Sequence, residues 1–369
     1  MLIHPYLSCT PLILKEPINW SRLATTFGLP KTGVQTVPYG SGHINDTYAV
    51  TLEVGSPHRY IFQRINQRVF RNVPALMENI QRVTNHIPHG LELVPTTSGG
   101  AFHHDEQGAF WRCYVFIENA ATHDVVTSPV QAREAAYSFG EFQGQLIDLP
   151  GARLHETIPD FHHTRRRFDR LRSAVDQDCE GRRSQAEAEI AFALEREPMV
   201  DRLLERAARG EIPERITHND TKINNVMLDD TTSRGVAVID LDTVMPGLAL
   251  YDFGDMVRTA TNSAEEDERD LKKVESRLDM FDALAEGYLA SAGSFLNQAE
   301  QEELVFSGRL MTFEVGIRFL TDHLEGDVYF KTHRSNHNLE RARCQFALVQ
   351  SMEENAEEMA GIIASHLER

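Results

Sequence analysis

Long apolar runs are missing from this sequence of 369 residues, and so are closely spaced cysteine pairs. No segment approaches the ~20 apolar residues that a membrane-spanning helix needs, and the region around Leu12 lacks the basic start of a secretory signal. The four cysteines, Cys9, Cys113, Cys179 and Cys344, form no C-x-x-C pair and no metal-ligand spacing. These absences argue against a disulfide framework or a zinc ribbon, and we expect a protein of the reducing cytoplasm.

Positive charge is also scarce. The chain has 37 Lys and Arg against 55 Asp and Glu, which gives a formal net charge of −18. Such a surface repels nucleic acids and anionic membranes, so we expect neither as a partner. The contents of 41% hydrophobic and 25% charged residues are those of an ordinary globular protein. The length favours two lobes over one compact core.

Two regions with different patterns divide the chain. Strand-type patterns occupy residues 34–37, 47–52, 60–65, 91–94 and 109–117, with one helix whose apolar stripe contains Leu76, Ile80 and Val83. Helical periodicity dominates later, over 130–146, 190–209, 277–291, 299–324 and 339–367. A β-hairpin formed by residues 226–228 and 236–239 interrupts it. We therefore predict an α+β, bilobal protein-kinase-like fold, with a sheet-rich lobe at residues 1–118 and a larger helical lobe at 119–369.

The strongest chemical signal is the segment His-Asn-Asp-Thr-Lys-Ile-Asn-Asn at residues 218–225. It fits H-x-D-x-x-x-x-N, which is typical of the catalytic loop of protein kinases and their small-molecule relatives. Asp220 would accept or orient the proton of the attacking hydroxyl, and His218 would hold the loop in shape. Lys222 would offset charge that develops on the transferred phosphoryl group. The pattern predicts a phosphotransferase that uses ATP.

The hairpin supplies a second ligand for a metal ion. Asn225 precedes its first strand and Asp240 follows its second, so both residues fall at the same open end. Magnesium prefers one or two protein oxygens together with nucleotide phosphates. We therefore predict that Asn225 and Asp240 hold magnesium, with Asp242 as a possible additional carboxylate.

A glycine-rich segment near the N-terminus predicts contact with nucleotide phosphates. Gly40-Ser41-Gly42-His43-Ile44-Asn45 resembles G-x-G-x-x-G with Asn45 in place of the last glycine. Kinases carry a phosphate-binding lysine on a following strand. The cation nearest that place is Arg64, which we expect on the nucleotide side with Gln63 on the opposite face. A surface arginine is an equally compatible interpretation, and Glu78 is a weak candidate for its partner because it lies opposite the apolar stripe of its helix.

Other motifs have simpler interpretations. Asp252-Phe253-Gly254 spells a kinase metal motif, but its position favours the N-cap of the following helix. His103-His104 and His162-His163 lie among polar residues and are expected at the surface. In the region 299–324, Glu314, Arg318 and Asp322 form a charged column between apolar surfaces. This column could be an ion-pair ladder or part of a substrate site.

Over nearly its full length, the chain resembles the aminoglycoside phosphotransferase and choline kinase superfamily, and within it the N-acetylhexosamine 1-kinases. The resemblance implies ATP and magnesium as cosubstrate and cofactor, transfer to the anomeric hydroxyl of a free sugar, and sugar contacts by Arg318 and Tyr329. The residues that carry the closer match are the glycine-rich segment with residues 63–66 and 75–80, the catalytic segment 218–226, the stretches 239–247 and 251–255, and the block 316–330.

One position departs from that resemblance. The hexosamine kinases have an aromatic residue after an arginine where this chain has Val257-Arg258-Thr259. Other acceptors therefore stay open, namely an amino alcohol, a thioribose or an aminoglycoside. A kinase-shaped binding protein without turnover is the alternative outside enzymes. The sequence leaves the oligomeric state open, and a monomer is compatible with it.

Overall fold

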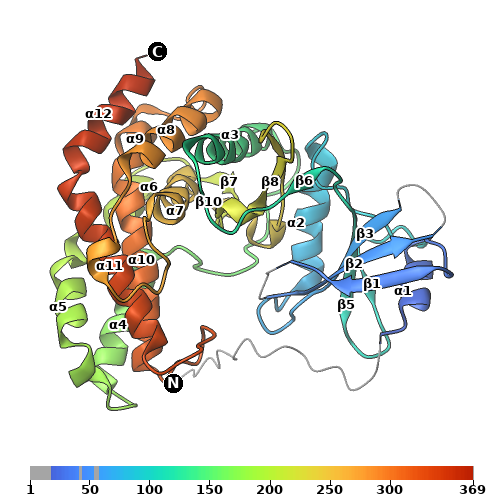
Figure 1. Cartoon of the computed structure of the whole chain (residues 1–369), viewed down its shortest axis with the longest axis horizontal. Coiled ribbons are helices and arrows are strands. Elements are labelled where there is room, and N and C mark those ends of the chain that lie inside the picture. The colour runs from blue at the N-terminus through green and yellow to red at the C-terminus, as the bar shows by residue number, and fades with distance from the viewer. Residues whose placement is uncertain (1–17, 41–43, 54–57, 369) are drawn as a thin grey trace.

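A computed structural model describes residues 18–40, 44–53 and 58–368. The N-terminal part is built on an antiparallel sheet in the order β1-β2-β3-β5-β4 (Figure 1). Its strands are β1 (Val34–Pro38), β2 (Asp46–Leu52), β3 (Arg59–Arg64), β4 (His103–His104) and β5 (Phe110–Val115). The strand expected at residues 91–94 is reduced to a single bridge between Leu93 and Tyr114.

Two helices cover the two faces of this sheet. The short helix α1 (Trp20–Thr26), which the sequence patterns did not predict, contributes Leu23 to a cluster with Phe62 and Trp111. The longer helix α2 (Val73–His86) buries the predicted stripe of Leu76, Ile80 and Val83. Figure 1 shows α2 between the sheet and the helical part of the chain. Its stripe joins the main core there, so α2 ties the two parts together.

The C-terminal part is mostly helical. Its helices are α3 (Pro129–Gln145), α4 (Thr164–Gln177), α5 (Glu187–Glu195), α6 (Arg202–Ala208), α7 (Ala249–Thr261), α8 (Leu278–Ala292), α9 (Gln298–Glu302), α10 (Leu304–Leu324), α11 (His337–Glu354) and α12 (Ala356–Leu367). Three predicted helices are each divided. Pro198 lies in a 3₁₀ turn between α5 and α6, because proline removes a helical hydrogen bond, and the other breaks fall at Glu303 and Asn355.

The predicted hairpin is confirmed. Strands β8 (Val226–Asp229) and β9 (Gly235–Val238) pair antiparallel, and β6 (Ala120–Ala121) adds a third strand beside β8. A second small ribbon joins β7 (Arg215–Thr217) to β10 (Met245–Gly247). The catalytic segment lies between β7 and β8, so both ribbons fix its ends.

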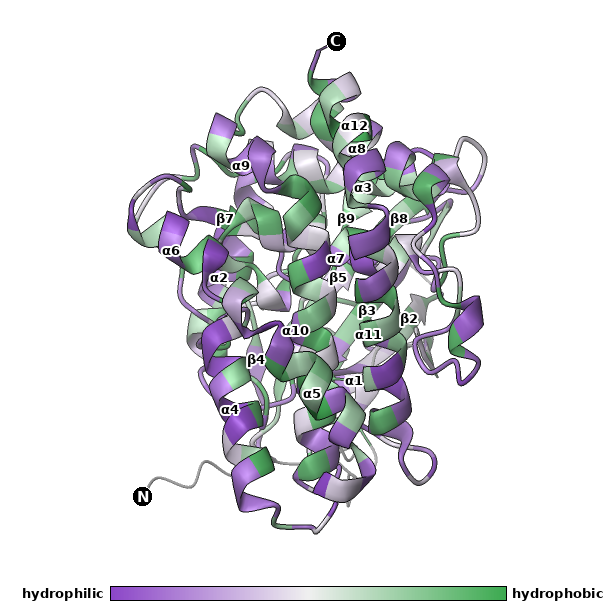
Figure 2. Ribbon diagram, turned by 90° about the vertical axis from the view of Figure 1, so that its left-hand side faces the viewer, coloured by the Kyte–Doolittle hydropathy of each residue, from purple (hydrophilic) through white to green (hydrophobic). Residues whose placement is uncertain are grey.

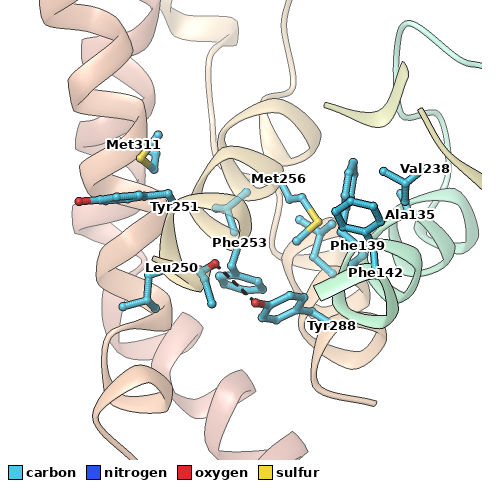
Figure 3. Packing of buried hydrophobic residues seen from close by; sticks show 14 of the residues in the cluster. Ala135, Phe139, Phe142, Val238, Leu250, Tyr251, Phe253, Met256, Tyr288 and Met311 are labelled. Carbon is cyan, nitrogen blue, oxygen red and sulfur yellow. Dashed lines mark hydrogen bonds between the residues drawn. The ribbon is translucent and has the colours of Figure 1, made fainter. Parts of the chain in front are cut away.

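Helix α7 lies at the centre of the main core. Figure 3 shows Phe253 and Met256 of α7 pointing toward Phe139 of α3 and Tyr288 of α8, while Met311 of α10 lies on the other side. Each fully buried side chain of this size contributes about 1.5–3 kcal/mol, so α7 is held firmly. The outer helices α4 and α5 show both hydrophilic and hydrophobic residues, as expected for helices that pack by one side (Figure 2). None of the described helices has the length and apolar character needed to cross a membrane.

Candidate active site

The catalytic segment is anchored by a carboxylate from α7. Asp252 accepts the backbone N–H of His218 at 2.9 Å and that of Asn219 at 2.7 Å. Gln143 of α3 donates a further hydrogen bond to Asp252 at 2.6 Å. The N-cap of α7 is Leu248, so the predicted capping role of Asp252 is wrong. The carboxylate instead fixes the backbone directly before Asp220.

The ring of His218 holds the segment against the hairpin. Its Nε2 lies 2.8 Å from the carbonyl oxygen of Ile239, which can only accept a hydrogen bond. Nε2 therefore carries the proton, and Nδ1 is left to accept the N–H of Asp220 at 3.3 Å. The shaping role predicted for His218 agrees with these contacts.

The side chains of Asp220 and Lys222 lie together. Lys222 Nζ is 2.9 Å from Asp220 Oδ1, and the Asp220 side chain is 27% exposed. Burial opposes ionisation of Asp220, but the charge of the Lys222 ammonium and its hydrogen bond outweigh it and lower the pKa of Asp220 to about 2. A carboxylate that is ionised at neutral pH and open to solvent can accept or orient a proton from a hydroxyl group.

The structure also brings Asn225 and Asp240 together at the open end of the hairpin. Ile239 N–H donates to the carbonyl oxygen of Asn225 at 2.9 Å, and Val226 pairs with Val238. Asn225 Nδ2 donates to the backbone oxygen of Asp220 at 2.8 Å and to its carboxylate at 3.2 Å. The amide oxygen Oδ1 of Asn225 is the atom with which this side chain could bind a cation.

Asp240 has an unusual backbone and an unusual charge environment. Its φ is 57°, in the left-handed region that few non-glycine residues adopt. The carboxyl remains open to solvent, yet desolvation by the surrounding protein and the negative charges of Asp242 and Asp220 raise the pKa of Asp240 to about 7. Asp240 thus combines a strained backbone with neighbouring negative charges, and both are common at functional sites.

The donor set at this end of the hairpin fits a hard divalent cation. Asn225 and Asp240 offer oxygen ligands, and the raised pKa of Asp240 means that a nearby positive charge would stabilise its ionised form. Within the described ranges, no group of three or more His, Cys, Asp or Glu has an arrangement that could hold a metal ion. Magnesium, which needs only one or two protein oxygens beside nucleotide phosphates, matches this pair better than zinc does.

The glycine-rich segment is described only in part. Gly40 has a φ of 78°, a conformation that favours glycine, whereas Ser41 and Gly42 lie outside the described residues. Asn45 is not in the left-handed region. Its side chain instead donates to Asp242 at 2.6 Å and accepts the N–H of Asn66 at 2.9 Å. Asn45 thus links the end of the segment to the residues that follow the hairpin.

Arg64 and Gln63 lie on opposite faces of β3, as predicted, and Arg64 is on the face that α1 covers. Arg64 lies across from Asp46 on β2 and Trp111 on β5, and it is ion-paired with Asp46. Residues paired in this way share a face of the sheet, and Trp111 packs with α1. Gln63 lies on the other face, opposite Arg112 of β5. Glu78, the weak candidate for the partner of Arg64, is 3.0 Å from His155 Nε2 instead.

A pocket beside α10 contains Arg318 and Tyr329. The guanidinium of Arg318 lies 5.5, 6.0 and 5.7 Å from the ring centres of Phe161, Tyr329 and Phe330. These distances suit cation–π contacts. Among the described residues, Arg318 has no ion pair.

The charged column on α10 is not an ion-pair ladder. Glu314 is fully buried and accepts hydrogen bonds from Thr164 at 2.5 Å and His162 at 2.9 Å. Asp322 accepts the backbone N–H groups of residues 328–330 and the side chain of Asn338. The two carboxylates on either side of Arg318 are therefore engaged elsewhere, and the ladder interpretation is wrong.

His162 connects this pocket to the catalytic segment. It is 7% exposed, so its predicted place at the surface is wrong. One ring nitrogen lies 2.9 Å from Glu314 and the other lies 2.8 Å from the carbonyl oxygen of Asn219. Because Phe161, which lies beside Arg318, precedes His162, and Asn219 precedes Asp220, His162 links the surroundings of Arg318 to the backbone directly before Asp220.

Comparison with known proteins agrees with this geometry. The model of a family described as phosphotransferase enzymes matches residues 35–293, which include the glycine-rich segment, the catalytic segment and the hairpin. The chain belongs to the phosphotransferase enzyme family. Arg318 and the other pocket residues on and after α10 lie beyond the matched range, whereas Arg167 and Arg170, which also line the pocket, lie within it.

Solved structures of low identity share the fold of this phosphotransferase. A microcompartment-associated aminopropanol kinase has a TM-score of 0.62 and 14% identity, with 92% of this chain and 98% of that chain covered. Choline kinase from Cryptosporidium parvum has a TM-score of 0.54 and 14% identity, with coverage of 92% and 95%. Amicoumacin kinase, solved with AMP-PNP and Ca²⁺, has a TM-score of 0.56 and 12% identity, with 88% of both chains covered. The predicted α+β kinase-like fold is confirmed by these structures, and the predicted phosphotransferase is confirmed by the family match.

Proposed function

We propose that this phosphotransferase moves the terminal phosphoryl group of ATP, with magnesium, to the anomeric hydroxyl of a free sugar, and that the sugar is an N-acetylhexosamine. The observation that carries the proposal is the position of Arg318. This cation has no ion pair among the described residues, is surrounded by aromatic rings, and is connected through Phe161 and His162 to the backbone beside Asp220.

The transfer step assigns a role to each residue of the catalytic segment. Asp220, ionised at neutral pH, accepts the proton of the sugar hydroxyl as the oxygen attacks. Lys222 provides positive charge beside the transferred group. Asn225 and Asp240 would hold magnesium, which neutralises charge on the phosphates when it is bound. Gly40, Ser41 and Gly42 would cover the phosphates with backbone N–H groups.

The pocket is better suited to a neutral acceptor than to a cationic one. Besides its aromatic rings, it is lined by Arg167, Arg170, Arg318, Thr321, Asp322 and Glu325. Asp322 is held by backbone N–H groups, and Glu325 pairs with Arg170. A cationic amino alcohol or aminoglycoside would meet arginines without a spare carboxylate. A sugar with an acetamido group can instead accept a hydrogen bond from Arg318 and lie against the aromatic rings.

The anomeric hydroxyl is the acceptor that this base suits best. It is more acidic than an ordinary alcohol. In phosphoryl transfer with a loose transition state, the attacking oxygen forms little bond to phosphorus, so it need not be a strong nucleophile. The low pKa of Asp220 makes it a weak base, which is adequate for such a hydroxyl. The intact set of Asp220, Lys222, Asn225 and Asp240 favours a working enzyme over a kinase-shaped binding protein.

The test is a screen of magnesium-dependent ATP consumption. The acceptors are free hexoses, N-acetylhexosamines, 5-thioribose derivatives, aminoglycosides, choline, ethanolamine and aminopropanol. We expect turnover with N-acetylhexosamines to exceed that with amino alcohols. Faster turnover with an amino alcohol or aminoglycoside would overturn the sugar proposal and keep the kinase. Nucleotide binding without consumption of ATP, with every acceptor, would favour the binding protein.

A further inference from the structure

Arg112 on β5 is a buried cation on the face of the sheet that carries Gln63. Its side chain is 1% exposed, which is rare for arginine. Its Nε donates to Gln63 Oε1 at 2.9 Å, and its guanidinium is ion-paired with Asp242. Asp242 comes from the turn after the hairpin, so this pair joins the N-terminal sheet to the segment that contains Asp240.

Asp242 also contacts the glycine-rich side of the site. One of its carboxylate oxygens pairs with Arg112, and the other accepts the amide of Asn45 at 2.6 Å. Its backbone oxygen accepts the hydroxyl of Thr157 at 2.8 Å. Arg112 and Asp242 therefore lie where the sheet, the end of the glycine-rich segment and the turn after the hairpin meet.

Protein kinases place a lysine on the third strand and orient it with a carboxylate, so that it holds the nucleotide phosphates. On the face opposite α1, β3 carries Arg59, Ile61 and Gln63. Arg59 lies at the start of the strand, where it pairs with Glu118, and the last residue on this face is Gln63, which is neutral. The nearest cation on that face is its cross-strand neighbour Arg112, and Asp242 is the carboxylate that fixes it. Arg64 lies on the α1 face and pairs with Asp46.

We propose that Arg112 binds the α- and β-phosphates of the nucleotide and that Asp242 orients it. The inference rests on the proposed use of ATP. A buried arginine is suited to this role, because its planar guanidinium keeps its charge and can donate to a phosphate oxygen while still paired with a carboxylate. The cation then comes from β5 instead of β3, on the same face of the sheet.

The test compares nucleotides that differ only in their phosphates. Calorimetry measures the affinity of the full chain for adenosine, ADP and ATP, with magnesium and again in EDTA, because loss of Asp242 could act through the metal. The main variant is Arg112→Met with Asp242→Asn, which avoids leaving a buried charge unpaired. The matched control is Arg59→Met with Glu118→Gln, an exposed pair on the same sheet.

We expect the Arg112/Asp242 double variant to bind ADP and ATP about 10- to 100-fold more weakly in both conditions, which corresponds to about 1.4–2.8 kcal/mol. Its adenosine affinity should stay within about twofold, and Arg112→Lys, which keeps the charge but loses the planar group of donors, should retain only part of the ADP affinity. The control pair should not change nucleotide affinity.

Three outcomes would contradict the inference. Equal losses for adenosine and ADP would show that Arg112 only maintains the fold. Unchanged ADP affinity in a folded double variant would remove Arg112 from the site. A phosphate-specific loss in Arg64→Met with Asp46→Asn, without one in the Arg112 variant, would assign the role to Arg64. If the unaltered protein binds none of the three nucleotides, the proposed use of ATP fails first.

Discussion

The ammonium of Lys222 lies 2.9 Å from a carboxylate oxygen of Asp220 and keeps that carboxyl ionised far below neutral pH. We expect Asp220→Asn to lower kcat by about 10²–10⁴-fold, because a positioned base typically contributes this much. Nucleotide affinity should change little, since asparagine preserves the shape of the side chain. Steady-state kinetics and calorimetry with ADP check both statements.

A fall in activity must be separated from a damaged fold. Glu205→Gln changes an exposed carboxyl on α6 that pairs with the exposed Arg209, 3.8 Å away, and it serves as the control. A folded Asp220→Asn protein that works at nearly the original rate would remove Asp220 from catalysis.

The raised pKa of Asp240 makes metal-dependent binding sensitive to pH. Protons and a cation compete for the same carboxylate. We expect the affinity for the magnesium–ADP complex to fall as pH is lowered through about 7, the pKa of Asp240. Asp240→Asn should weaken binding and remove the part of the pH dependence that comes from the protein. A slope identical in the two proteins would contradict the role of Asp240.

The same shift predicts a change in stability. The pKa of Asp240 is raised from 3.8 to about 7, so the folded protein holds this proton more tightly than the unfolded chain. The resulting stabilisation is complete below pH 4 and is lost as pH rises through about 7. Asp240→Asn, which stays neutral, should therefore melt at a higher temperature than the original protein at pH 8 without metal. The difference should shrink as pH falls toward 5, and scanning calorimetry measures it.

The parts of the site that could be predicted from sequence are local. Residues 218–225 are contiguous, and a hairpin necessarily brings the residues at its two ends together, so the proximity of Asn225 and Asp240 followed from spacing alone. The contacts that escaped prediction join distant segments. Asp252 lies 33 residues from Asn219, Arg112 lies 130 from Asp242, and His162 lies 152 from Glu314.

The orientation of the side chains on β3 shows why sequence periodicity could not predict which residue lies on the nucleotide side. Residues alternate along this strand, but both faces are covered, one by α1 and one toward α2 and the rest of the core. When one face of a strand is buried and the other is half-buried, the sequence pattern does not say which face holds a ligand. The choice between Arg64 and Gln63 therefore required the register with β2 and β5. The same limit applies to His162, whose partners lie in other elements.

Asp252 acts on the catalytic segment through its backbone. We expect Asp252→Asn to lower the melting temperature by a few degrees, since a buried acceptor is replaced by a group that turns an N–H toward other N–H groups, at a cost of about 1–3 kcal/mol. It should lower kcat more than it changes either KM, because the segment that carries Asp220 loses its anchor. A change in KM alone would contradict this positioning role.

Arg318 is the residue whose substitution tests how the acceptor sugar is bound. Removing a hydrogen-bond partner from a substrate costs about 1–3 kcal/mol, so Arg318→Ala should raise KM for the sugar by roughly 5- to 150-fold. KM for ATP should stay within about twofold, because the residues that line the pocket on α10 include none of the catalytic segment and none of the hairpin. Arg172→Ala on α4, an exposed arginine paired with Glu197, is the matched control. Equal increases in both KM values would argue for general damage.

The identity of the attacking hydroxyl can be tested on the substrate. If the anomeric oxygen of an N-acetylhexosamine attacks phosphorus, its methyl glycoside should be inert, because the methyl group occupies that oxygen. The glycoside should still bind with an affinity similar to that of the free sugar, since Arg318 and the aromatic rings contact other parts of the molecule. It should therefore act as a competitive inhibitor against the free sugar.

Two measurements complete this test. Phosphorus NMR should place the phosphate of the product on carbon 1, and the inhibition constant of the glycoside should rise in Arg318→Ala as KM for the sugar does. Consumption of ATP with the glycoside, or a phosphate on carbon 6, would overturn anomeric transfer while the kinase activity itself would stand. A glycoside that neither reacts nor binds would contradict the expectation that Arg318 and the aromatic rings hold the sugar through other parts of the molecule.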